Sequence, residues 1–312
     1  MENLNAIKKR IKSVTDISQM TNAMQLVSSA KMRRSLALHD SVHPFFLLCA
    51  ESMQEIRNHA ENIENPFFVL EQKKTGETWK IAYFVLSGDQ GLAGAYNNNM
   101  VKITEEHVQN KILDNTRKGI QTDYKLFVFG KLAREKLIRN GYNVDRDFSF
   151  PISEPDFYQA RNVASIIRQK FLMQEFDLVY LIYTKMKSAT VMVPAVVRLA
   201  PVDMKSIASV LPDNMTDAGM AVSNGTELEY SPNPQEVFDF LIDTYLNAMV
   251  YGAMVDAYAS EQTARLTAMD NATSNAEDML KKLQLISNRA RQAKITNELT
   301  EIINGAEQVD NL

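Results

Sequence analysis

The sequence predicts an α/β protein in which a long helix at each end of the chain flanks a compact central domain. The first 43 of the 312 residues contain neither glycine nor proline, and after Pro234 only Gly252 and Gly305 interrupt the chain. The other glycines and prolines lie between these two segments. Because glycine and proline mark turns and helix ends, this distribution indicates a long helix, a compact centre and a second long helix.

The N-terminal helix is predicted over residues 1–62, where apolar side chains recur at steps of three and four. An average step below 3.6 residues is typical of a left-handed coiled coil. We therefore expect this stripe to face a partner helix. Its members are Leu4, Ile7, Ile11, Val14, Ile17, Met20, Met24 and Val27.

The C-terminal helix is predicted over residues 233–306. Asn233 is a suitable N-cap, Pro234 fits the first helical position, and Glu236 completes a capping-box-like pair. Its stripe consists of Met269, Ala272, Ala276, Met279, Leu283, Ile286, Ala290 and Ala293. Alanine lets a partner helix approach closely but buries little area, so a helix of about 70 residues is not stable alone in water. An antiparallel coiled coil of the two chain ends is the expected arrangement.

The central domain, predicted over residues 66–204, alternates strands and helices. Strands are indicated by WKIAYFVLS, YKLFVFG, DLVYLIYTK and TVMVPAVVRLAPV, and helices by residues 95–113, KLAREKLIRN and DFYQARNVASIIRQKFLMQEF. Continuous apolar strands between helices predict a partly parallel sheet that is covered on both faces. Pro194 places the last strand near an edge. Residues 205–232 lack periodicity and are interpreted as a connector.

Composition excludes several classes of protein. A net charge of −4 and a pI near 5.7 argue against a nucleic-acid binder. The single cysteine, Cys49, permits neither an internal disulfide nor a thiolate metal cluster, and we interpret it as a buried apolar side chain. No run approaches the ~20 apolar residues of a membrane span. His39 and His43 have the spacing of half a zinc site, but without a third ligand they are interpreted as surface residues.

The segment SGDQGLAGAYNNN, which follows the first predicted strand, raises the question of nucleotide binding. Its glycines Gly88, Gly91 and Gly94 have the spacing G-x-x-G-x-x-G rather than the G-x-G-x-x-G of dinucleotide-binding folds, and no Walker lysine follows. Asp89 would place a negative charge where a phosphate would lie. We interpret the loop as a tight turn and expect no cofactor. A nucleotide enzyme with helical arms remains the alternative.

Basic residues gather at the N-terminal end of this acidic chain. Residues 1–34 carry Lys8, Lys9, Arg10, Lys12, Lys31, Arg33 and Arg34, against only Glu2 and Asp16. The cluster lacks the aromatic residues of RNA-binding surfaces, so it is either a solvated helix face or a surface for an acidic protein. The C-terminal segment NRARQAKITNELTEIINGAEQ is polar nearly all round, which is typical of a helix that is exposed or enclosed by partners.

These features together resemble the γ subunit of bacterial F-type ATP synthases over essentially the whole chain. The resemblance is carried by IKKRIKSVTDISQMTNAMQLVSSAKMRRS, by the SGDQGLAGAYNNN loop and by the C-terminal segment. The C-terminal signature matches at Ile295, Thr296, Glu298, Glu301, Gly305 and Ala306. Gln308 departs from the family, which more often has a small or basic residue there.

The resemblance implies a rotor shaft. The two terminal helices would wind into an antiparallel coiled coil inside a ring of three α and three β subunits. A Rossmann-like α/β domain without a bound nucleotide would sit, with the ε subunit, on the membrane c-ring. Flow of protons or sodium ions turns the shaft, which imposes different conformations on the three β sites in turn.

The same resemblance implies a chain that is not catalytic, holds no cofactor or metal, binds no nucleic acid and lies peripherally at the cytoplasmic face of the bacterial plasma membrane. The alternative from another class is a non-rotating coiled-coil adaptor protein with a Rossmann-like domain. Partner identity separates the two.

Contacts with the α/β ring are also implied. Met24 matches a family residue near an acidic loop of β, and Arg291 and Gln292 match a pair that contacts a loop of the catalytic ring. Thr296, Glu298 and Glu301 match polar positions that support coupling, and the basic residues expected to face β are Lys8, Lys9, Lys12, Arg33 and Arg34.

Overall fold

The computed structural model describes two units of the chain. The described residues are 4–59, 65–70, 72–148, 150, 154–188, 191–202, 231 and 234–310. Unit 1 comprises Met1–Ala30 and Arg265–Leu312, and unit 2 comprises Lys31–Ala264. Two long helices, α1 (Leu4–His59) and α7 (Pro234–Asp310), contribute residues to both units. The predicted N-cap Asn233 and residues 205–230 of the predicted connector lie outside the described residues.

Unit 2 is built on a four-stranded sheet. Its strands are β1 (Thr78–Leu86), β2 (Gln121–Phe129), β3 (Leu178–Met186) and β4 (Met192–Ala200), in the order β2-β1-β3-β4. β1 pairs in parallel with β2 and with β3, while β4 pairs antiparallel to β3 at one edge. The predicted partly parallel sheet is therefore confirmed, and Pro194 lies on an edge strand as expected.

Helices connect the parallel strands. α2 (Tyr96–Arg117) links β1 to β2, and α3 (Lys131–Arg139) and α4 (Phe157–Leu172) link β2 to β3. α2 continues past its predicted end at Leu113, because no residue that breaks a helix occurs before Gly119, whose φ is 71°.

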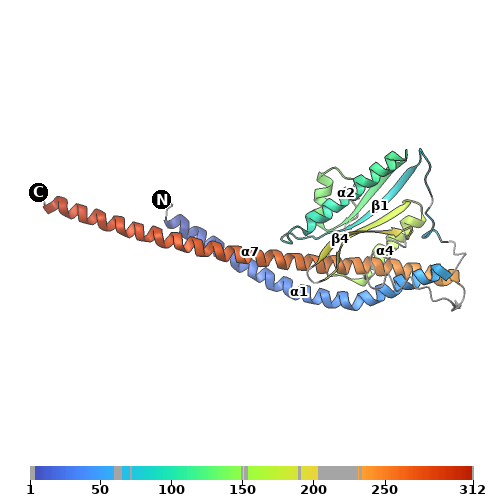
Figure 1. Ribbon diagram of the computed structural model, residues 1–312, viewed down its shortest axis with the longest axis horizontal. Helices are drawn as coiled ribbons and strands as arrows, with labels where there is room; N and C mark the ends of the chain where they lie inside the picture. Colours follow the sequence, from blue (N-terminus) through green and yellow to red (C-terminus); the bar gives the residue numbers. More distant parts are fainter. Residues whose placement is uncertain are drawn as a thin grey trace. The chain divides into compact units, whose positions relative to one another are not determined.

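Both faces of the sheet are covered, with α2 and α7 on opposite sides of it (Figure 1). One face of β1, formed by Ile81, Tyr83 and Val85, packs with α2 and α3. Its other face packs with α4 and with residues 242–257 of α7. Because successive side chains of a strand point to opposite faces, six consecutive residues of β1 are buried. Cys49 of α1 is buried in the core that contains α4 and α7, and its burial was predicted.

In unit 1 the two helices run side by side in opposite directions (Figure 1). Gln25 Nε2 on α1 donates a hydrogen bond of 2.8 Å to Asp270 Oδ1 on α7. One turn away, Thr273 Oγ1 donates to Thr21 Oγ1, also at 2.8 Å. Residue numbers fall on α1 as they rise on α7, so the predicted antiparallel pair is confirmed.

The structure corrects the predicted stripe on α1. Its first part was right, since Ile7 is buried, but Ile17, Met20 and Val27 are exposed. The seam between the helices passes instead through their neighbours Ser18, Thr21, Gln25 and Ser28. These residues are small or polar. They continue the seven-residue repeat of the seam, whereas the apolar residues after Val14 depart from that repeat.

A similar correction applies to α7. Met269, Ala276 and Leu283 are buried as predicted, whereas Met279 and Ile286 are exposed. The seam takes two positions from each heptad. At the second of them it passes through the half-buried Leu280 and Ser287, each one residue after the predicted Met279 and Ile286. The sequence-based prediction was wrong here because it assigned the more apolar-looking position to the seam, whereas the register of the partner helix selects Leu280 over Met279 and even Ser287 over Ile286.

Candidate partner-binding surfaces

The residues predicted to contact partners are divided between the units. Unit 1 contains Lys8, Lys9, Lys12, Met24, Arg291, Gln292, Thr296, Glu298 and Glu301, and unit 2 contains Arg33 and Arg34. The side chain of Glu301 lies outside the described residues. Arg34 Nη1 is 3.5 Å from Glu154 Oε2, but both side chains are exposed, so this ion pair contributes little stability.

Unit 1 carries a continuous basic region. Residues 4–15 of α1 and residues 279–297 of α7 hold nine basic side chains and no acidic one. Continuing the register set by Gln25 and Asp270 places residues 280–291 of α7 alongside residues 4–15 of α1, and residues 292–297 follow directly beyond the start of α1. We call this region the basic collar; it consists of Lys8, Lys9, Arg10, Lys12, Lys281, Lys282, Arg289, Arg291 and Lys294.

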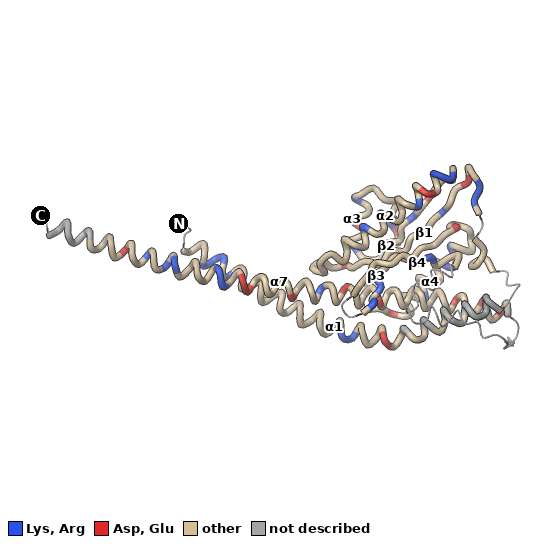
Figure 2. Tube along the Cα trace, in the orientation of Figure 1, with Lys and Arg blue, Asp and Glu red and all other residues tan. Residues whose placement is uncertain are grey.

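The collar is visible in Figure 2 as blue segments on both helices toward the chain termini. Its two halves are far apart in sequence, so sequence reasoning treated them as separate clusters. Such a concentration of positive charge, in a chain whose net charge is −4, favours association with an acidic partner surface.

Beyond the start of α1, α7 continues as a single helix (Figure 1). There Ile295, Leu299, Ile302 and Ile303 are all exposed. Their spacing of four, three and one puts them on one face of the helix. We call residues 292–303 the apolar tip. A stripe of large exposed apolar side chains indicates a surface that a partner covers.

Polar groups of the tip bond mostly within the helix. Thr296 Oγ1 donates to the carbonyl of Gln292 at 3.0 Å, and Lys294 Nζ is 3.5 Å from Glu298 Oε1. The side chains of Arg291 and Gln292 are exposed. Met24, by contrast, is half-buried on α1 next to Gln25, so it lies at the border between the seam and the surface.

Two carboxylates lie at the glycine loop of unit 2. Asp89 Oδ1 accepts a hydrogen bond of 2.9 Å from the backbone N–H of Lys131, in the first turn of α3. A Cβ added to Gly88 would lie 2.7 Å from Glu261 Oε1 of α7, so this carboxylate abuts the loop. Asp89 takes up a backbone N–H at the start of α3 and Glu261 fills the space beside Gly88, which supports the interpretation of the loop as a turn.

Sequence reasoning missed the segment of α7 that meets this loop. Its polar residues Asp256, Ser260, Glu261, Gln262 and Thr263 are all buried. Ser260 Oγ lies 3.3 Å from the carbonyl of Thr184, to which it donates, and Tyr96 donates to the carbonyl of Ala257 at 3.1 Å. A polar run inside a long helix, without an apolar stripe, was the available signal.

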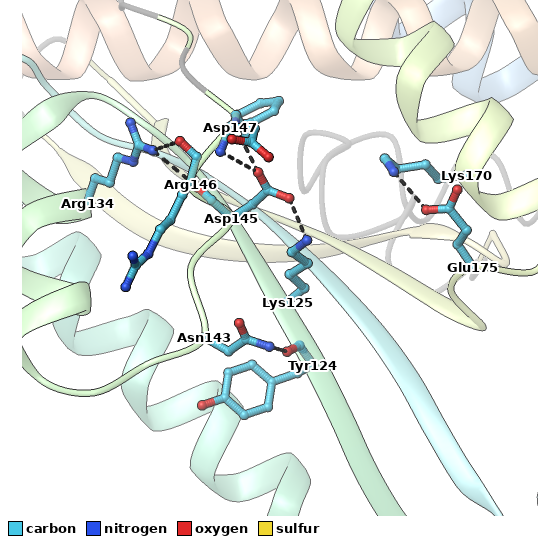
Figure 3. Close-up of polar contacts among 10 residues, drawn as sticks. Tyr124, Lys125, Arg134, Asn143, Asp145, Arg146, Asp147, Lys170 and Glu175 are labelled. Atoms are coloured by element: carbon cyan, nitrogen blue, oxygen red, sulfur yellow. Dashed lines mark hydrogen bonds and ion pairs between the residues drawn. The ribbon is translucent and has the colours of Figure 1, made fainter.

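The outer edge of β2 is closed by its own chain. The N–H of Leu126 donates to the carbonyl of Asn143, and the N–H of Asp145 donates to the carbonyl of Leu126. Figure 3 shows how Asp145 is held, with Lys125 Nζ 2.7 Å from its Oδ2. Arg134 donates to the carbonyl groups of Asp145 and Arg146. Around Leu126 this edge is therefore closed to a partner strand.

Burial opposes ionisation of Asp145, but hydrogen bonds outweigh it. The bond from Lys125 and those from the N–H groups of Phe148 and Asp147 hold the pKa of Asp145 below its usual value. The Asp145 carboxylate is thus ionised at neutral pH. Its hydrogen bonds from the N–H groups of Asp147 and Phe148 stabilise the turn at residues 145–148.

Comparison with known proteins decides the family. A sequence model described as ATP synthase matches residues 3–309. The ATP synthase gamma chain of Acetivibrio thermocellus is 39% identical over 307 residues, which cover 98% of this chain and 99% of that protein. This chain belongs to the ATP synthase gamma-chain family.

Other gamma chains agree. That of Ruminiclostridium cellulolyticum is 38% identical over 308 residues, covering 99% of both chains. A gamma chain of Acetobacterium woodii, described as sodium ion specific, is 35% identical over 315 residues, again covering 99% of both. The resemblance that the sequence predicted is confirmed.

The gamma-chain fold is confirmed by solved structures. A chain of the Euglena gracilis mitochondrial ATP synthase, from a structure of OSCP, F1 and c-ring, matches with a TM-score of 0.60. The match covers 98% of this chain and 94% of that chain at 15% identity. In the part of this chain that the structure describes, no helix is long and apolar enough to cross a membrane.

Proposed function

We propose that this member of the gamma-chain family is the rotating central shaft of an F-type ATP synthase. It couples the flow of protons or sodium ions through a c-ring to ATP synthesis and hydrolysis at the β subunits. Unit 1 turns inside a ring of three α and three β subunits, and unit 2 contacts the ε subunit and the c-ring. The chain is not catalytic by itself and works peripherally at the cytoplasmic face of the bacterial plasma membrane.

The apolar tip carries this proposal. A single helix in water, without a partner to cover its apolar face, is not stable over this length. Ile295, Leu299 and Ile302 therefore need an apolar sleeve around them. The small residues of the seam, such as Ala276 and Ser28, keep the helix pair thin enough to fit inside a ring.

The basic collar suits a partner that changes position. A hydrogen-bond network fixes one geometry, whereas attraction between a cluster of charges and acidic loops varies slowly with angle. Lys8, Lys9 and Lys12 can thus be attracted to each of three β subunits in turn. Arg33 and Arg34 of unit 2 are proposed to face acidic loops of β as well.

Specific contacts are proposed at six further positions. Arg291 and Gln292 present exposed donors to a loop of the catalytic ring. Met24 is proposed to lie near an acidic loop of β. Thr296, Glu298 and Glu301 are proposed to support coupling.

Assembly is tested by purifying the complex from detergent-solubilised membranes through a tag on this chain. Intact-mass spectrometry should find one copy with three α and three β subunits, and the eluate should hydrolyse ATP. The purified chain alone should not hydrolyse ATP. Recovery without α and β, or in equal number with another partner, would instead indicate a non-rotating adaptor.

Coupling is tested with Met24→Lys. The lysine places a positive charge at a position proposed to lie near an acidic loop of β, and its attraction to one loop resists rotation of the shaft. We expect several-fold less ion pumping for each ATP hydrolysed, whereas the apolar control Met24→Leu should pump normally. Normal pumping by Met24→Lys would contradict the contact that is proposed for Met24.

A further inference from the structure

His39 is not the surface residue that the sequence suggested. In unit 2 its side chain is 18% exposed and lies between two carboxylates. His39 Nε2 on α1 is 3.1 Å from Asp256 Oδ1 on α7, and Asp256 is itself only 13% exposed. His39 Nδ1 is 3.3 Å from Oδ1 of the neighbouring Asp40.

This geometry favours the charged form of the imidazole. A neutral histidine has one ring N–H and therefore donates one hydrogen bond, while its other nitrogen presents a lone pair. With a carboxylate at each nitrogen, only the imidazolium donates both bonds. The hydrogen bond to Asp256 raises the pKa of His39, against the opposing effect of burial, and Asp40 raises it further.

We propose that His39, Asp40 and Asp256 form a pH-sensitive clasp, which ties α1 to α7 within unit 2 while His39 is protonated and weakens when the proton leaves. The clasp itself does not depend on the proposed function. One consequence does rest on the proposed function: in a rotating shaft, the pair of α1 and α7 becomes more compliant as the surrounding pH rises.

The surroundings of the clasp favour this response. Asp40 acts on His39 from its own helix and Asp256 acts on it from α7. On the sheet side β3 brings Tyr183 near Asp256. Burial, together with the charge of Asp256, raises the pKa of Tyr183, so its hydroxyl stays neutral and supplies no charge. When His39 loses its proton, Asp256 keeps a hydrogen bond but loses the opposite charge beside it.

The direction of the pH effect follows from the raised pKa. The unfolded chain has a histidine pKa of about 6.5. The stabilisation by the clasp is therefore complete below about pH 6.5 and is lost as the pH rises through the higher pKa of the folded state. Histidine is suited to this task because its titration falls near physiological pH.

The experiment is a titration of the full-length chain by NMR of the histidine Cε1 groups, from about pH 6 to about pH 9. His39→Gln assigns the signal of His39. We expect its midpoint to lie above that of an ordinary histidine, and to move down in Asp256→Asn and, to a smaller extent, in Asp40→Asn. Thermal unfolding of the wild type should fall in temperature over the same pH range, and His39→Gln should lack this fall.

A His39 midpoint at or below the ordinary value in the wild type would overturn the clasp. So would a midpoint that Asp256→Asn leaves in place. If Asp256→Asn does not fold, the exposed Asp40→Asn decides, because an unmoved midpoint there contradicts the arrangement. None of these measurements involves partner subunits, so the clasp and the proposed function fail separately.

Discussion

Phe84 of unit 2 and Leu283 of unit 1 are both buried, but in very different surroundings. Phe84 stacks on Phe127 with ring centroids 4.7 Å apart, inside a core that α4, α7, Cys49 of α1 and the sheet build together. In the described part of unit 1, the buried apolar side chains are only Ile7, Met269, Ala276 and Leu283. At roughly 25 cal/mol per Å² of buried apolar area, unit 1 gains far less from its own packing.

Polar groups show the same contrast. Unit 2 pairs many of its charges internally, as in the ion pairs of Lys125 with Asp145 and Lys73 with Asp177. In unit 1 the basic collar is exposed, and its ion pairs, such as Lys281 with Asp278 and Lys294 with Glu298, lie on the helix surface, where they add little stability. Unit 2 is thus stabilised by its own core, whereas unit 1 depends on what surrounds it.

The largest expected effect is in the core of unit 2. Phe84→Ala should lower the free energy of unfolding by about 3–5 kcal/mol, because it removes a buried ring and leaves a cavity. Urea denaturation followed by circular dichroism measures this. The exposed Leu113→Ala is the control, with an expected change within about 0.5 kcal/mol. A decrease in the free energy of unfolding of less than about 1 kcal/mol for Phe84→Ala would contradict the contrast between the two units.

The next effect concerns the backbone of unit 2. Gly130 has a φ of 80°, and an added Cβ would lie 2.2 Å from the carbonyl oxygen of Ser87. Gly130→Ala should cost at least about 2 kcal/mol, since left-handed backbone is unfavourable for alanine and the neighbouring strand must also shift. Gly91→Ala is the matched control, because nothing lies within 4 Å of its Cβ. Equal melting temperatures for the two variants would contradict this.

A smaller and more local effect is expected in unit 1. Leu283→Ala should cost about 2 kcal/mol or less, because the thin seam can close around the smaller side chain. Hydrogen exchange should become faster near Leu283 while β1 keeps its protection. Equal loss of protection in β1 would show that the two units do not behave independently.

The smallest effect depends on pH and separates the units again, because all four histidines lie in unit 2. Burial, assisted by the charge of Lys111, lowers the pKa of His107 to about 4. Between about pH 6.5 and pH 4 the unfolded chain therefore binds a proton that the folded chain does not. As the pH is lowered over this range, the free energy of unfolding should decrease by about 1–2 kcal/mol. This is less than the full pKa difference implies, because the ring is partly exposed to solvent.

His107→Phe tests this effect. Phenylalanine keeps a ring against Tyr83 and Tyr180, which His107 contacts edge-on, but it does not titrate. Denaturation at pH 7 and at pH 4.5 should show a smaller loss on the acid side in the variant than in the wild type. The same loss in both would assign it to other groups. His39 acts in the opposite direction, since its proton stabilises the folded chain.

Much of the fold was predictable from local features. The order of helices and strands followed from the placement of glycine and proline and from apolar runs, and Pro194 indicated the edge strand. Cys49 was correctly predicted to be buried. The candidate surfaces were predictable in part, because the basic residues of α1 and the polar end of α7 are visible as sequence clusters.

Other features were not predictable because they join distant residues. The basic collar forms only when α1 and α7 pair in one register. His39 was misread as a surface residue because Asp256 lies more than 200 positions away in the sequence. The contact of Glu261 with the loop at Gly88 has the same origin.

The sequence by itself determined the types of element and the family of this chain, since these depend on local propensity and on residues that can be read in order. Tertiary structure alone decided which side of each long helix faces its partner. At Met279 and Leu280, or at Ile17 and Ser18, adjacent residues compete for one seam position. The choice depends on the register of the opposite helix, because a helix rotates by about 100° for each residue and only its partner defines the inner face.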